Sequence, residues 1–174
     1  MAYCRRILSW RRIVLTAAIA VSLILLWPAE CLTAQCDGRL LFAWPVRAGE
    51  TFEISFTHSL NLSPVTDVIE WTGEELVVRK SIFKTFGAGI PVPSDGIGTE
   101  LKGVDGHYEL TGIDKHMRSV TIMTQEIPDH RIRMNGREAF LLELAGSGRS
   151  VEIEVRRVLL FTRLICTGRL HAIL

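Results

Sequence analysis

A histidine stands at position 58, where the pattern of its strand calls for an apolar side chain. Residues 51–58 alternate between apolar and polar types, which is typical of a β-strand with one buried face. His58 continues the apolar side of that strand, and Asp67 lies on the apolar side of a second strand at 65–71. If the two strands form a hairpin with His58 opposite Val65, His58 and Asp67 are diagonal neighbours within side-chain reach. The pair then either pins the turn by a structural hydrogen bond or supplies a binding or catalytic group.

The turn after His58 is rich in side chains that bond to local backbone. Ser59 and Asn61 either satisfy amides of the turn or belong to a binding surface. Activation of Ser59 by His58 is disfavoured, because adjacent residues of a strand point to opposite faces. The chain also contains no Gly-x-Ser-x-Gly sequence. We therefore do not expect a serine hydrolase.

Asp129 and His130 open another strand and are the remaining candidates for chemistry. A zinc site built from His58, Asp67 and His130 would have enough nitrogen and oxygen ligands. No His-x-x-x-His or Cys-x-x-Cys spacing supports such a site, however. We predict no metal and no cofactor, and we place Asp129 and His130 among the candidate binding residues.

Several short strands must position these residues. Asn135-Gly136 is the preferred dipeptide of a type I′ hairpin, and no long helical pattern follows residue 36. The sequence therefore predicts an all-β fold, either an antiparallel β-sandwich or a partly open barrel, preceded by one N-terminal hydrophobic helix. The expected strands lie at 39–46, 51–58, 65–71, 76–84, 108–112, 120–124, 131–134, 137–144 and 151–155.

Residues 86–106 form a long segment that holds six of the fourteen glycines. Loops longer than about 12–15 residues without secondary structure of their own are usually functional or disordered. Because apolar residues recur in this segment, we expect an ordered loop folded over the end of the domain that carries His58. Its first residues, Phe86, Gly87 and Gly89, complete the candidate set. We expect His58, Asp67 and this segment to form one surface for a partner or a small solute.

Residues 1–36 are predicted to be an N-terminal leader, and their first part resembles an export signal. Residues 1–12 are basic and residues 13–27 carry no charge. A run of this length lies between a cleaved signal peptide and a retained transmembrane anchor, so both remain open. In either case residues 37–158 are expected outside as a β domain, followed by a tail at 159–174 of unassigned role. The protein is then single-pass in the cytoplasmic membrane with its domain in the periplasm, or secreted after cleavage.

The expected compartment bears on disulfide formation, and the net charge bears on nucleic-acid binding. An oxidising compartment permits a Cys36–Cys166 bridge, although unpaired thiols are the plainer expectation. The net charge of +1 provides no electrostatic footprint for nucleic acid.

Three segments of the chain carry a family resemblance. Residues 56–65 fit aromatic-x-His-Ser-x-x-x-x-Pro-Val, residues 83–91 contain Phe-Gly-Ala-Gly, and residues 129–132 begin with Asp-His. In this order they resemble the uncharacterised bacterial family catalogued as domain of unknown function 1850, over about residues 39–158. One position departs from the family, which often has an acidic residue where this chain has Thr66.

The resemblance implies a small protein with an N-terminal membrane segment, encoded beside TRAP transporters that use TAXI-type solute receptors. It implies no catalytic activity. We therefore expect a membrane-tethered extracytoplasmic accessory protein that binds a TRAP permease or receptor subunit, or its solute. Two alternatives stay open: a small exported enzyme using His58 with Asp67 or His130, and a structural or assembly module without a ligand.

Overall fold

The chain alternates between two antiparallel sheets after an N-terminal helix. The computed structural model describes residues 2–86 and 96–171, with side chains for residues 10–86 and 96–166. In chain order the elements are α1 (Ala2–Leu25), β1 (Pro28–Cys36), β2 (Arg39–Pro45), β3 (Thr51–Thr57), β4 (Pro64–Trp71), β5 (Leu76–Phe83), β6 (Glu100–Val104), β7 (His107–Met117), β8 (Ser119–Met123), β9 (Arg131–Met134), β10 (Arg137–Phe140), α2 (Leu141–Ala145), β11 (Ser150–Leu159) and α3 (Leu160–His171).

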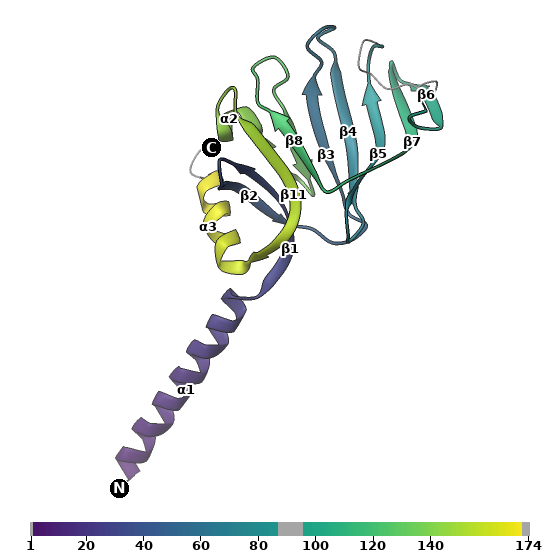
Figure 1. Cartoon of the computed structure of the whole chain (residues 1–174). Helices are drawn as coiled ribbons and strands as arrows, with labels where there is room; N and C mark the ends of the chain where they lie inside the picture. Colours follow the sequence, from purple (N-terminus) through teal and green to yellow (C-terminus); the bar gives the residue numbers. More distant parts are fainter. Residues whose placement is uncertain (1, 87–95, 172–174) are drawn as a thin grey trace.

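The two sheets differ in size. The smaller has the strand order β2-β1-β11-β8 and the larger the order β10-β9-β3-β4-β5-β7-β6. The larger sheet extends past the smaller one at the β5, β7 and β6 end, and neither closes into a barrel (Figure 1). The predicted all-β fold is confirmed in this form, an open antiparallel arrangement resembling a sandwich and preceded by a helix.

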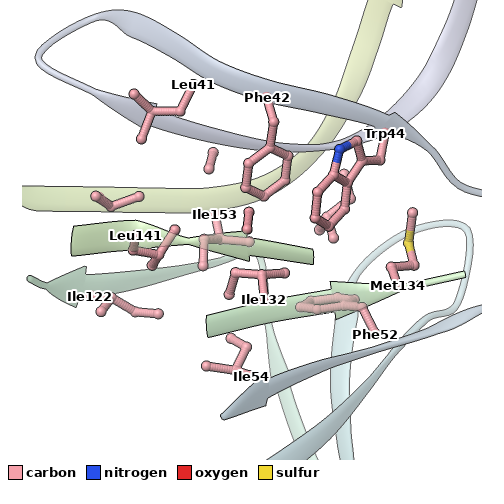
Figure 2. Close-up of a cluster of buried hydrophobic side chains, with 14 of the residues drawn as sticks. Leu41, Phe42, Trp44, Phe52, Ile54, Ile122, Ile132, Met134, Leu141 and Ile153 are labelled. Carbon is pink, nitrogen blue, oxygen red and sulfur yellow. The ribbon is translucent and has the colours of Figure 1, made fainter. Parts of the chain in front are cut away.

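A single large apolar cluster holds the sheets together. Alternate residues of strands such as β2 and β3 point between the sheets, and Phe42 and Trp44 of β2 stack with ring centroids 4.2 Å apart. Figure 2 shows side chains of both sheets and of α2 meeting in this layer. Burial of this apolar area is the main driving force for folding. The labelled residues are Leu41, Phe42, Trp44, Phe52, Ile54, Ile122, Ile132, Met134, Leu141 and Ile153.

Most predicted strands recur close to their expected positions, and the predicted hairpin is confirmed. Two expectations differ: residues 100–104 of the predicted loop form strand β6, and the strand predicted at 108–112 extends to Met117 as β7. Asn135 and Gly136 have φ angles of +49° and +75°, and Met134 pairs with Arg137 across them. Positive φ at both central residues defines the type I′ turn. The last part of the strand predicted at 137–144 is different, since the chain turns there into the short helix α2.

Residues 28–36, grouped with the leader in the sequence-based prediction, form strand β1 of the smaller sheet. β1 pairs along its length with β11 and on its other side with β2. Cys31, Leu32, Thr33 and Ala34 are all fully buried, so the strand is covered on both faces. A strand buried on both faces shows no alternation. For that reason β1 could not be distinguished by pattern from the apolar run before it.

The outer face of the smaller sheet is covered by α3, which lies against β2 (Figure 1). This helix accounts for most of the tail that the sequence left without a role. Cys36 and Cys166 are both buried, and no disulfide joins them. Within the part of the chain that the structure describes, no helix has the length and apolar character needed to cross a membrane.

Candidate functional site

A cavity of about 200 Å³ opens between the two sheets, beside the large apolar cluster. Its walls come from β3, β4, β5, β7 and β8, together with the residue that precedes β9. Three of its side chains are titratable, and the others are apolar. The lining residues are Ile54, Phe56, Asp67, Ile69, Val78, Lys115, Met117, Val120, Ile122 and His130.

Asp67 is the acidic group of this cavity. It lies on the inward face of β4, opposite Ile54 of β3 and Ser81 of β5. Burial raises the pKa of its carboxyl, while a hydrogen bond with Ser81 and the charge of Lys115 act in the opposite direction. The carboxylate is thus a desolvated group held by one hydroxyl and one nearby cation.

His130 faces the same cavity from the larger sheet. Its ring stacks on Phe56 with centroids 5.3 Å apart. Burial lowers the pKa of the imidazole, and the charge of Asp129 opposes that shift. The Nδ1 atom is buried and has no hydrogen-bond partner among the described residues. Because a buried polar atom without a partner is costly, this unsatisfied nitrogen marks His130 as a candidate functional residue.

His58 lies outside this cavity and holds the β3–β4 turn. Its backbone N–H donates to Ser63 O at 2.9 Å, and its Nδ1 accepts from the Leu60 N–H at 3.3 Å. In the actual register Phe56, not His58, opposes Val65, and Asp67 opposes Ile54. Asp67 is therefore displaced from His58 by four residues of strand, roughly 13 Å along β3. The assumed register was wrong because the last inward-facing residue of β3 that pairs with β4 is Phe56, one inward-facing position earlier than expected.

The described parts of the three resembling segments, residues 56–65, 83–86 and 129–132, meet at the same end of the larger sheet. Thr57 at the end of β3 donates its backbone N–H to Pro128 O at 2.8 Å. Across the turn, Thr85 Oγ1 donates to Ser63 Oγ at 2.8 Å, which joins the β3–β4 turn to the chain leaving β5. We call this end of the larger sheet the loop end; it comprises the β3–β4 turn at 58–63, the chain after β5 at 84–86 and residues 127–130. The loop end thus brings together residues that are far apart in sequence.

The other candidate residues of the loop end have varied roles. Asn61 Oδ1 accepts hydrogen bonds from the backbone N–H and the hydroxyl of Ser63, whereas Ser59 is exposed. Phe86 packs on the Tyr108 ring at 4.4 Å and remains 48% exposed. Gly87 and Gly89 lie outside the described residues, so their expected approach to His58 stays a prediction.

A family model matches residues 52–141, and its description reads "Domain of unknown function (DUF1850)". The chain belongs to this family. No curated protein and no solved structure matches the chain. The match runs from β3 to α2 and so includes Asp67, Lys115, His130 and the loop end.

Sequence reasoning about this DUF1850 protein missed Lys115. In β7, Leu110 and Ile113 are buried, and Lys115 lines the cavity although it is exposed, because a bulge at Gly112 inverts the alternation. Gly112 has a φ of +69°, which favours glycine. That glycine within a strand was the available signal for the bulge.

The described residues of the DUF1850 chain contain no group of three or more His, Cys, Asp or Glu side chains placed to hold a metal ion. The zinc alternative with His58, Asp67 and His130 is not formed, because His58 bonds to its own turn while the other two face the cavity. The chemistry the cavity offers is one carboxyl, one ammonium and one neutral imidazole beside an apolar surface.

Proposed function

We propose that this protein is a membrane-attached accessory domain on the outer side of the cytoplasmic membrane that binds the solute of a TRAP-type transporter. The observation that carries the binding role is the convergence of Asp67, Lys115 and His130 on one otherwise apolar cavity. A few convergent polar groups in an apolar pocket are the usual pattern of a small-molecule site. The transporter role is supported by the resemblance of the three segments, two of which contribute Phe56 and His130 to this cavity.

The cavity favours a small ligand with an apolar body and one or two polar groups. Its volume of about 200 Å³ is below the range of about 300–1,000 Å³ that drug-sized ligands occupy. The apolar part of the ligand would lie against Ile54, Ile69 and Val78. A polar group of the ligand would lie beside the His130 ring, and Lys115 or Asp67 would select its charge. The same loop end also exposes Leu60, Leu62 and Ile127, which suits contact with a transporter subunit.

The experiment compares two histidines in the native host. Growth of a deletion strain on a panel of small organic carbon sources first identifies a solute whose uptake depends on the protein. The strain is then complemented with His130→Ala or with His116→Ala, whose ring lies outside the cavity and bonds to Glu75 at 2.7 Å. Uptake and protein level are measured in the same cells.

We expect His130→Ala to lower uptake towards the level of the deletion strain at normal protein level, and His116→Ala to support full uptake. Full uptake by His130→Ala would contradict solute binding in this cavity. A deletion strain that grows normally on every solute would contradict the transporter role.

A small exported enzyme is the second candidate, and one observation favours it. Asp67 and His130 line one cavity with their pKa values shifted upward and downward respectively, as in many acid–base pairs. Purified protein that converts the identified solute, and loses this turnover in both Asp67→Asn and His130→Ala, would decide for the enzyme.

A further inference from the structure

Exposed apolar side chains gather where α1 meets the domain. Trp27, the last residue before β1, is 72% exposed, and Leu26 beside it is also exposed. Leu159 at the end of β11 pairs with Pro28, and the Leu160 N–H donates to Trp27 O at 3.3 Å. These bonds fix the start of α3 next to the end of α1 (Figure 1).

The first turns of α3 extend this apolar area. Cys166 is buried on the side that faces the smaller sheet, whereas Phe161, Leu164 and Ile165 are exposed. Residues spaced by three and four share one face of a helix. An exposed face on a globular domain is ordinarily polar, so this helix is apolar on the side where water would favour charge. We call Leu26, Trp27, Leu159, Phe161, Leu164 and Ile165 the junction surface.

Two features indicate what covers the junction surface. It is continuous with the uncharged run at 13–27, whose described side chains in α1 are nearly all exposed. It is also flanked by a cation, because Arg157 is exposed and lines one groove with Trp27 and Pro28. Glu30 shares this groove, but its carboxylate accepts a hydrogen bond from the indole of Trp71 at 3.2 Å.

We propose that the junction surface lies in the interfacial layer of an anionic phospholipid membrane. Tryptophan and arginine are enriched at that depth, where an apolar body can be buried while the polar end reaches lipid phosphates. Contact of this kind needs apolar area together with basic charge, and it does not require a helix that spans the bilayer. The inference rests on the proposed membrane attachment and adds that α3 itself touches lipid. The domain would then stand with its loop end directed away from the membrane.

Site-specific photocrosslinking of the full chain tests this contact. A photoreactive phenylalanine derivative is placed at Leu164, which is 57% exposed, or at Leu62 of the loop end, which is 68% exposed and serves as the matched control. Each protein is reconstituted with vesicles of phosphatidylcholine and phosphatidylglycerol, floated on a gradient and irradiated. Lipid adducts are counted by mass spectrometry.

We expect both variants to float and adducts to form several-fold more at Leu164 than at Leu62, with a lower yield at Leu164 in vesicles of phosphatidylcholine alone. Flotation with equal yields at the two positions would overturn the junction contact while leaving membrane attachment intact. A crosslink from Leu164 to a second copy of the chain would overturn it in favour of self-association. Failure to float would overturn the membrane attachment as well. An unchanged Leu164 yield without phosphatidylglycerol would overturn the anionic preference.

Discussion

Replacement of Gly112 by alanine tests the bulge that brings Lys115 into the cavity. At its φ of +69°, an L-residue costs about 1 kcal/mol relative to glycine. An added Cβ would also overlap the hydroxyl of Thr99 and lie 3.2 Å from its backbone nitrogen. That nitrogen donates to Thr111 O at 2.9 Å, and loss of this bond costs about 1 kcal/mol more. With the displaced packing, Gly112→Ala should lower the free energy of unfolding by about 2–3 kcal/mol.

Gly136→Ala is the matched control for this substitution. Gly136 has a similar φ of +75°, but its added Cβ meets nothing within 4 Å. Gly136→Ala should therefore lower the free energy of unfolding only by the conformational cost of positive φ, about 1 kcal/mol. Urea unfolding in mild detergent, followed by the fluorescence of buried Trp44 and Trp71, gives both values. Equal losses in the two variants would mean that Thr99 does not pack on Gly112, and the account of the bulge would fail.

Two further changes test the core and the cavity. Ile132→Ala removes a fully buried side chain between the sheets and should cost about 2–5 kcal/mol in the same urea experiment, whereas Ile127→Ala, at a site 57% exposed, should cost less than about 0.5 kcal/mol. For Asp67, burial raises the folded-state pKa above the unfolded value, so wild-type stability falls as pH rises through that interval. Asp67→Asn has no carboxyl to ionise, so its urea midpoint minus that of the wild type should increase from acidic to neutral pH. A difference in midpoint that does not change with pH would contradict a desolvated carboxyl at this position.

The local alternation of apolar and polar residues was sufficient to predict much of the fold. Strand β3 has one face on the core and one towards solvent, so its alternation is visible in the sequence. The turn at Asn135-Gly136 was predictable because both neighbouring strands show the same alternation. The same turn type occurs at Asp37-Gly38, with φ angles of +49° and +73°, but it was not predicted. Its preceding strand, β1, is buried on both faces and reads as part of the leader.

The site was harder to predict than the strands because it depends on register. His58 and Asp67 were paired on the assumption that His58 opposes Val65, and a register shift of two residues along β3 separates them. Lys115 lay beyond the strand predicted at 108–112, and strict alternation continued from Leu110 would point it away from the cavity that it lines. Whether Asp67 and His130 face one cavity depends on the order β9-β3-β4, which the sequence does not specify. Such features arise from tertiary pairing and leave no periodic signal.

The acidic group of the cavity lies between two apolar clusters along β4. The large cluster includes Ile69 of β4, and a second cluster around Phe83 and Leu110 includes Val65 of the same strand. Asp67 lies between these two β4 residues, where the apolar pattern of the strand would be continued most stably by another apolar side chain. A buried carboxyl lowers stability there, since burial penalises its charged form. Locally unfavourable residues in a core are characteristic of sites under functional constraint. Asp67 therefore supports a binding role for this cavity more strongly than it supports a structural one.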